Sequence, residues 1–167
     1  MTRIEHMAAT PPQYPEIPSP HAWYGRIFPS KDAMSHAVDH ISNVEYVRWL
    51  DMAGQQHLAG LGWSAQDLLQ QGAMWFVARH EIDYRLEAST NDDLMLATWV
   101  RDVRRVKSWR DTIVWRMAGT HIEVVCTAST LWVHVNLTTR RPIRPPSEMI
   151  DALQPLGTTD SPWRNRA

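Results

Sequence analysis

The segment between residues 32 and 43 gathers side chains that could take part in acid–base or nucleophilic catalysis. It holds two aspartates (Asp32 and Asp39), two histidines (His36 and His40) and Asn43. A carboxylate in such a segment is able to attack a carbonyl carbon or to activate a water molecule. The segment ends where we expect a helix to begin, and the unpaired N–H groups of a helix start stabilise negative charge on a substrate oxygen. The candidate catalytic chemistry therefore lies at the entry of a helix.

That helix is indicated by a cap and by an apolar stripe. Ser42 and Glu45 have the spacing of a capping box, in which the serine hydroxyl accepts from a backbone N–H and the glutamate reaches back to the cap residue. Apolar residues and one glycine then recur at spacings of three or four, namely Val44, Val47, Leu50, Gly54, Leu58 and Leu61. We predict a helix over residues 43–60, ended by Gly60 and Gly62.

The remaining elements are one short helix and a series of strands. Ser64 and Asp67 form a second capping box, which predicts a short helix that stops by Gly72. Alternating apolar and polar residues between turn sequences predict strands over residues 22–28, 76–87, 94–103, 108–117 and 122–135. The apolar residues of the second strand are expected to be buried on one face: Phe76, Ala78, Ile82, Tyr84 and Leu86. We predict an α+β fold in which an antiparallel sheet of about five strands surrounds one long helix.

Several stretches of the chain resemble a known family. Asp32-Ala-Met-Ser-His36 is similar to the Asp-Ala-Met-Gly-His that opens the active-site loop of hotdog-fold thioesterases of the 4-hydroxybenzoyl-CoA thioesterase group. Residues 41–49 resemble the Val-Asn-Asn-x-x-Tyr-x-x-Trp run at the start of that family's central helix, and residues 136–145 resemble the exit from its last strand. The resemblance covers residues 22–154 and implies the hotdog fold, with the order strand, helix and then four strands.

The resemblance also implies an activity, the hydrolysis of an acyl-CoA thioester to a free acid and CoA without a metal or organic cofactor. The candidate catalytic residues are then Asp32, His36 and Asn43. Asp32 would attack the thioester carbonyl or activate water, backbone N–H groups at the loop-to-helix junction would hold the oxyanion, and Asn43 would orient the thioester or the water. Tyr46 is expected to line the acyl pocket, although packing in the core is the more frequent role of such a tyrosine.

Basic and aromatic residues are candidates for binding the substrate. Arginine suits the bidentate binding of phosphate, and CoA carries a diphosphate and a 3'-phosphate. The resemblance implies candidate substrate-binding residues at the mouth of the groove, namely Arg105, Lys107, Arg140 and Arg141. A solvated basic rim is the alternative for each of them. Most of the strand tryptophans are expected in the core or an interface, with one or two bordering an acyl or aryl pocket: Trp75, Trp99, Trp109, Trp115 and Trp132.

One spacing departs from the family pattern. In the family the loop aspartate precedes the helix tyrosine by ten positions, whereas Asp32 precedes Tyr46 by 14, and the residue ten positions before Tyr46 is His36. Either four residues such as 37–40 are inserted after an intact motif, or the carboxylate has been lost and Asp39 or a histidine replaces it. We favour the insertion, because five consecutive residues then agree with the motif.

Other functions compete with the hydrolase. A non-catalytic acyl- or aryl-CoA binding protein is the main alternative, and hydration or dehydration of a CoA-linked chain ranks third because the Gly-Asp-x-Asn-Pro setting of the hydratase branch is absent. His36 and His40, with Asp39 between them, form a weak candidate metal set. The other histidines are scattered and supply no further ligand at a recognisable spacing, so we predict no metal. His80 and His134 are expected to be sheet histidines with local hydrogen-bond partners.

Composition restricts the cellular setting and the partners. With 167 residues the chain corresponds to about one domain, and no apolar run approaches the roughly 18 residues of a membrane span. The net charge of -1 argues against nucleic acid as a partner. Cys126 is the only cysteine and the chain starts without the apolar block of a secretory signal, so we expect a cytoplasmic protein.

The ends of the chain and the sheet edges complete the expectations. Residues 1–20 read as a proline-rich arm and 156–167 as a polar tail, both outside the core of a folded unit at 21–155. A single helix cannot cover both the edges of the sheet and nine tryptophan side chains. We therefore predict a homodimer or homotetramer. The expected substrate is an acyl-CoA or an acyl-carrier-protein thioester.

Overall fold

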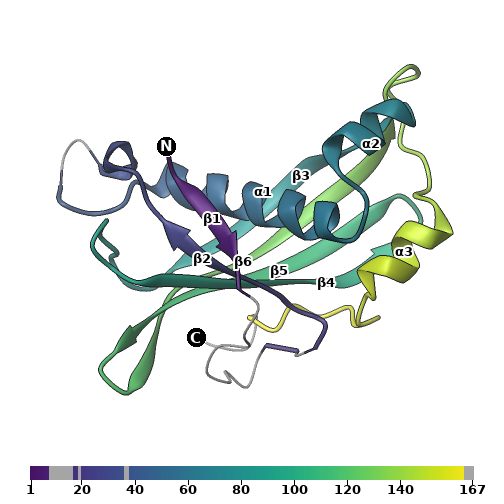
Figure 1. Cartoon of the computed structure of the whole chain (residues 1–167). Helices are drawn as coiled ribbons and strands as arrows, with labels where there is room; N and C mark the ends of the chain where they lie inside the picture. Colours follow the sequence, from purple (N-terminus) through teal and green to yellow (C-terminus); the bar gives the residue numbers. More distant parts are fainter. Residues whose placement is uncertain (8–16, 19, 36–37, 164–167) are drawn as a thin grey trace.

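A computed structural model describes residues 1–7, 17–18, 20–35 and 38–163 of the chain. The elements follow in the order β1 (Arg3–His6), β2 (Trp23–Phe28), the 3-10 turn η1 (Lys31–Ala33), α1 (Asn43–Gly60), α2 (Ala65–Gln70), β3 (Ala73–Tyr84), β4 (Leu94–Arg104), β5 (Lys107–Ala118), β6 (His121–Asn136) and α3 (Ser147–Leu153). The strands form one antiparallel six-stranded sheet in the order β1-β2-β4-β5-β6-β3, and α1 lies across one face of it (Figure 1). The predicted α+β architecture is confirmed, with β1 and α3 as additions.

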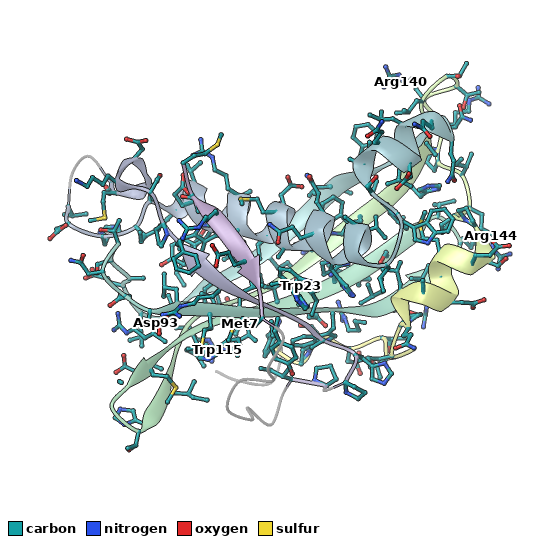
Figure 2. The ribbon with its side chains drawn as sticks, viewed as in Figure 1. Met7, Trp23, Asp93, Trp115, Arg140 and Arg144 are labelled. Carbon is teal, nitrogen blue, oxygen red and sulfur yellow. The ribbon has the colours of Figure 1, made fainter. Side chains whose placement is uncertain are left out.

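Apolar layers cover both faces of the curved sheet. Between α1 and the sheet, Trp49 is 0% exposed and its ring lies 4.6 Å from that of Tyr46. On the opposite face Trp99 and Trp115 are buried, as predicted, and Trp115 lies below the ribbon of the sheet in Figure 2. No helix within the described residues combines the length and the apolar character needed to cross a membrane.

The buried face of α1 is rotated relative to the predicted stripe. Val44 is 60% exposed and Val47 is 36% exposed, whereas Tyr46 and Trp49 point into the core. Two aromatic side chains bury far more apolar surface than two valines do, so the helix turns the aromatic residues toward the sheet. The predicted bounds of the helix, residues 43–60, are confirmed.

Only one of the two predicted capping boxes forms. Ser42 caps α1 by accepting from the N–H two residues further on (3.4 Å), but the carboxylate of Glu45 accepts from the Thr2 hydroxyl (3.1 Å) instead of reaching back to the cap. The N-terminal segment therefore competes for the side chain that the box needs. Before α2 the reciprocal pair is complete, because the Asp67 N–H donates to Ser64 Oγ (3.2 Å) and the Ser64 N–H donates to the Asp67 carboxylate (2.8 Å).

Both ends of the chain contribute to the core, which contradicts the expectation that they lie outside it. β1 pairs with β2, and Ile4 is 5% exposed. Near the C-terminus, Trp163 is 7% exposed, and its indole N–H donates to the carbonyl oxygen of Ala128 (3.0 Å). Ile4 joins the apolar cluster between α1 and the sheet, and Trp163 joins the cluster on the opposite face. The proline-rich stretch 8–16 lies outside the described residues.

Strand β3 forms one edge of the sheet and is exposed along its middle. Phe76 is 45% exposed and Val77 is 37% exposed. The prediction that the apolar residues of this strand are buried on one face is wrong within the single chain, since Ala78, Tyr84 and Leu86 are also exposed and only Ile82 packs against the core. Alternation identifies the two faces of a strand, but an edge strand at the margin of the helix has nothing to cover either of them.

Candidate active site

The turn that carries Asp32 is tied to the start of α1. The Ser42 N–H donates to the carbonyl oxygen of Ala33 at 2.8 Å, and Met34 faces Ile41 across an isolated antiparallel bridge. Asp32 itself is exposed, and its carboxylate has no hydrogen bond or ion pair with any described residue. A carboxylate in this state is free to meet a ligand beside the helix start.

The same bridge bears on the spacing difference from the family. It joins residues 34 and 41, and next to it the Ser35 N–H donates to the carbonyl oxygen of His40 (2.7 Å). The turn that carries Asp32 is thus held next to the start of the helix, and the insertion of four residues after the motif stays a prediction. His36 lies outside the described residues, and Asp39 is exposed.

Asn43 and Tyr46 border a small pocket of about 190 Å³ at the helix start, with residues 84–87 on its other side. Asn43 is exposed, and its backbone N–H has no acceptor among the described residues. Tyr46 is 4% exposed and stacks edge-on against Tyr84 at 5.2 Å, so it serves both in the core and in the lining. Burial raises the pKa of the Tyr46 phenol far above its ordinary value, which keeps it neutral.

A second, largely apolar cavity of about 160 Å³ lies between the middle of α1 and the strands β3, β5 and β6. Trp75 and Trp132 are in its lining, as predicted for one or two of the strand tryptophans. The cavity also contains Asp51 and Arg110, which the sequence did not single out. In the sequence Arg110 belongs to a run of basic residues between positions 101 and 116, and that run by itself does not distinguish it from the exposed Arg105 and Lys107. Arg110 lies in β5 four residues before Val114, whose side chain is buried on the face toward α1. An even separation within a strand puts both side chains on the same face, and this spacing is the signal that could have identified Arg110 as buried.

The predicted phosphate-binding residues lie on two neighbouring turns at one end of the sheet. Arg105 and Lys107 flank the β4–β5 turn, which is joined to the end of β6 by a hydrogen bond between the backbone groups of residues 134 and 106 (2.9 Å). Arg140 and Arg141 follow β6, and Arg140 lies at the far tip of that loop in Figure 2. The four side chains are exposed and have no acidic partner in the described part of the chain. This arrangement fits a basic rim.

Histidines elsewhere in the sheet have local partners, as predicted. His80 Nδ1 lies 2.9 Å from the Thr130 hydroxyl, and His134 Nδ1 lies 3.3 Å from the carbonyl oxygen of Ile143. Across residues 1–7, 17–18, 20–35 and 38–163, no three His, Cys, Asp or Glu side chains are grouped as a metal site would require. Two members of the weak candidate set, Asp39 and His40, are described, and His36 is not.

The burial of His57 predicts that the fold loses stability at acidic pH. It is 7% exposed, and its Nδ1 accepts from Arg110 Nη1 at 2.9 Å. Burial, with the charges of Arg110 and His6 adding to it, lowers the pKa of His57 to about 3 from an ordinary value of 6.5. At pH values between these two pKa values, His57 is protonated in the unfolded chain and neutral in the folded chain. The contribution of neutral His57 to the free energy of unfolding is therefore full above about pH 6.5 and is lost as the pH falls toward 3.

We expect the free energy of unfolding to drop by about 2 kcal/mol between pH 7.5 and pH 5 from this residue. Urea unfolding curves at the two pH values measure the drop. His57→Gln should be less stable at pH 7.5 but lose clearly less on acidification, while the exposed control His121→Gln keeps the wild-type loss. An equal loss in His57→Gln and wild type would contradict the assignment.

Comparisons with known proteins agree on one family. The family model of the thioesterase-like superfamily matches residues 34–153, a region that begins two residues after Asp32. A 4-hydroxybenzoyl-CoA thioesterase variant solved with 4-hydroxybenzoyl-CoA is 19% identical over 80% of this chain and 99% of its own, with a TM-score of 0.74. A search of the curated proteins finds no match.

Two proteins of Staphylococcus aureus have the same fold. Its DHNA-CoA thioesterase is 22% identical over 74% of this chain and 80% of its own, with a TM-score of 0.67. A hypothetical protein solved in complex with CoA is 14% identical over 83% of this chain and 87% of its own, with a TM-score of 0.71. At these identities the structures establish the hotdog fold, and the family match extends over most of the chain. The protein therefore belongs to the thioesterase-like superfamily.

Proposed function

We propose that this protein is an acyl-CoA thioesterase, which hydrolyses a thioester to a free acid and CoA. The observation that carries the proposal is the tie between the Asp32 turn and the start of α1, where the Ser42 N–H donates to the Ala33 carbonyl oxygen (2.8 Å). The tie holds the turn that carries Asp32 at the start of a long helix, and the Asp32 carboxylate has no hydrogen bond or ion pair with a described residue. Membership of the thioesterase-like superfamily supports the same reaction class.

In the proposed mechanism Asp32 acts on the thioester carbonyl, either as nucleophile or as the base that activates water. The carbonyl oxygen gains negative charge and is held by helix-start N–H groups, among them that of Asn43. If Asp32 acts as the base, the C–O bond to water forms, the C–S bond breaks, and the departing thiolate takes up the proton that Asp32 removed from the water. If Asp32 acts as the nucleophile, the C–O bond forms to its carboxylate as the C–S bond breaks, the thiolate takes up a proton from solvent, and water then hydrolyses the anhydride to the free acid and restores Asp32. His36 belongs to the same loop and is proposed as a catalytic partner, with the Asn43 side chain orienting the thioester or the water.

The basic rim is proposed to hold the phosphates of CoA. Arg105, Lys107, Arg140 and Arg141 are exposed and unpaired in the described chain, so their guanidinium and ammonium groups remain available for charge-assisted hydrogen bonds. A rim at the surface binds the nucleotide end of the substrate and leaves the acyl end to enter the apolar cavity. An acyl-carrier-protein thioester would present its phosphate at the same rim.

The exposed edge strand supports a homodimer. The middle of β3 presents unpaired backbone groups beside Phe76 and Val77, and edges of this kind are normally covered. If two β3 strands pair antiparallel about their midpoints, the Tyr84 end of one lies against the Ala73 end of the other. The helix start of one copy then lies near the cavity of its partner, so two copies would complete each substrate site.

Thiol release from a panel of short-chain, long-chain and aryl acyl-CoAs tests the activity directly. We expect hydrolysis of at least one class. One observation favours the alternative, a non-catalytic CoA-ester binding protein: Asp32 precedes Tyr46 by 14 positions, four more than the family pattern has. Tight binding of CoA esters without thiol release across the panel would select that alternative and reject the hydrolase, and hydration of crotonyl-CoA would point to the hydratase class.

A further inference from the structure

The cavity under α1 contains a buried positive charge that forms no ion pair with a carboxylate of the described chain, although the charge of the neighbouring Asp111 raises the pKa of Arg110 against the larger, lowering effect of burial. Arg110 is 6% exposed and lines the cavity. Its Nη1 donates to His57 Nδ1 (2.9 Å) and to the Thr98 hydroxyl (3.3 Å), and it forms no ion pair with any described residue. The next residue, Asp111, is bound instead to Arg101 (3.1 Å). A buried charge without a counter-ion is expensive, so this guanidinium is a site for an anion that the chain itself does not supply.

Two further donors line the cavity beside Arg110. The indole N–H of Trp132 is buried without an acceptor, and the buried Ser108 has no hydrogen bond from its hydroxyl among the described residues. Ser108 pairs with Trp132 across β5 and β6, and Arg110 pairs with Thr130 two residues along. Neighbouring positions on one face of the sheet therefore bring a guanidinium, an indole N–H and a hydroxyl into the same cavity.

A glycine in the middle of α1 lets Trp132 and Arg110 approach the helix closely. A Cβ at Gly54 would lie 3.3 Å from Trp132 Cζ2 and 3.6 Å from Arg110 Nε. A glycine within a helix costs about 1 kcal/mol relative to alanine. The missing side chain is needed for this approach, which places the arginine and the tryptophan side by side in the lining of the cavity.

The rest of the cavity limits what can carry that anion. Its other walls are mostly apolar, formed by Leu58, Trp63, Leu68, Met74, Trp75 and Leu153. Its volume of about 160 Å³ is close to that of an apolar cavity that holds one benzene molecule, roughly 150 Å³. A short chain or a single ring therefore fits. Asp51 repels an anion on its own side of the lining, and its carboxylate accepts from Gln55 Nε2 (2.7 Å), so the anion belongs on the Arg110 side.

We propose that Arg110 selects acyl groups with a carboxylate at the end remote from the thioester, so that the preferred substrates are short monothioesters of dicarboxylic acids. This inference rests on the proposed function. The planar guanidinium binds the remote carboxylate through its free N–H groups, and the Trp132 N–H adds a further hydrogen bond. Arg110 is thus a specificity-determining residue that sequence position alone would assign to the basic rim.

Substrate pairs of equal chain length test the inference. Succinyl-CoA is compared with butanoyl-CoA, and glutaryl-CoA with pentanoyl-CoA. We expect kcat/KM to favour the carboxylated member by at least about tenfold, in line with the cost of leaving buried polar groups unpaired. Arg110→Met should abolish the preference, so that kcat/KM becomes equal for the two members of each pair. Trp132→Phe, which removes only the N–H and part of the ring, should reduce the preference. The control Arg116→Met lies on the same strand, bound to Asp92 and Glu123, and should keep the preference.

The outcomes separate this inference from the proposed function. Hydrolysis of the neutral esters at equal or greater kcat/KM in the wild type would overturn the inference and leave the thioesterase in place. Titration with free glutarate and pentanoate, followed by tryptophan fluorescence, supplies a readout without turnover. Glutarate binding that is lost in Arg110→Met, in a protein that hydrolyses nothing, would keep the anion site and reject the hydrolase. Should Arg110→Met fail to fold, the wild-type pairs and Trp132→Phe decide.

Discussion

Replacing Asp32 with alanine is expected to lower kcat for thioester hydrolysis by about 10²- to 10⁴-fold, the range typical for loss of a general base or acid. The chain should fold as before, because Asp32 is exposed and its carboxylate has no interaction with a described residue. Surface substitutions of this kind change stability by about 0.5 kcal/mol or less. Thiol release at saturating substrate gives the rate, and the urea midpoint gives the stability.

Asp39→Ala is the matched control, because Asp39 is also exposed and belongs to the same loop. It should retain nearly full activity if the Asp-Ala-Met-Ser-His motif is intact and four residues follow it as an insertion. The reverse result, a silent Asp32→Ala and an inactive Asp39→Ala, would show that the loop carboxylate has moved to the second aspartate. Full activity in both variants would remove the loop carboxylate from the mechanism.

Replacing Val77 with aspartate is expected to separate the proposed dimer and to abolish most of the hydrolysis with it. Val77 lies in the exposed middle of edge strand β3, where a second β3 would pair. An unpaired charge buried in such an interface costs about 3 kcal/mol or more, which corresponds to at least about a 100-fold rise in the dimer dissociation constant. Light scattering coupled to size exclusion measures the mass, and thiol release measures the activity of the same fractions.

Met117→Asp controls for the charge itself, because Met117 is 37% exposed, like Val77, but lies at the end of β5 away from the edge. It should remain dimeric and active. A Val77→Asp protein that stays dimeric would place the interface elsewhere. A monomer with wild-type kcat would show that each chain carries a complete site, which contradicts the proposal that the helix start of one copy serves the cavity of another.

Local patterns predicted the elements well. The helix over 43–60, the cap before α2 and the positions of five strands all depend on contacts between residues close in sequence. β1 was not predicted, because four residues in a proline-rich setting carry too little alternation, and their pairing with β2 depends on residues 19 to 25 positions away. The rotation of α1 has a similar cause, since Val47 and Trp49 both fit an apolar stripe and only the sheet decides between them.

The amino-acid sequence by itself determined the α+β class, the long helix and the loop that carries Asp32 at its entry, because periodicity and capping are local properties of the chain. Only the tertiary structure showed that Arg110 is buried under Gly54 while Arg105 and Arg140 stay in water, and that β3 is an open edge. The charge of an arginine and the alternation of the residues around it are the same in the sequence whether the arginine is buried or exposed. The difference arises from which strand lies beneath the helix, and that is decided by long-range pairing across the sheet.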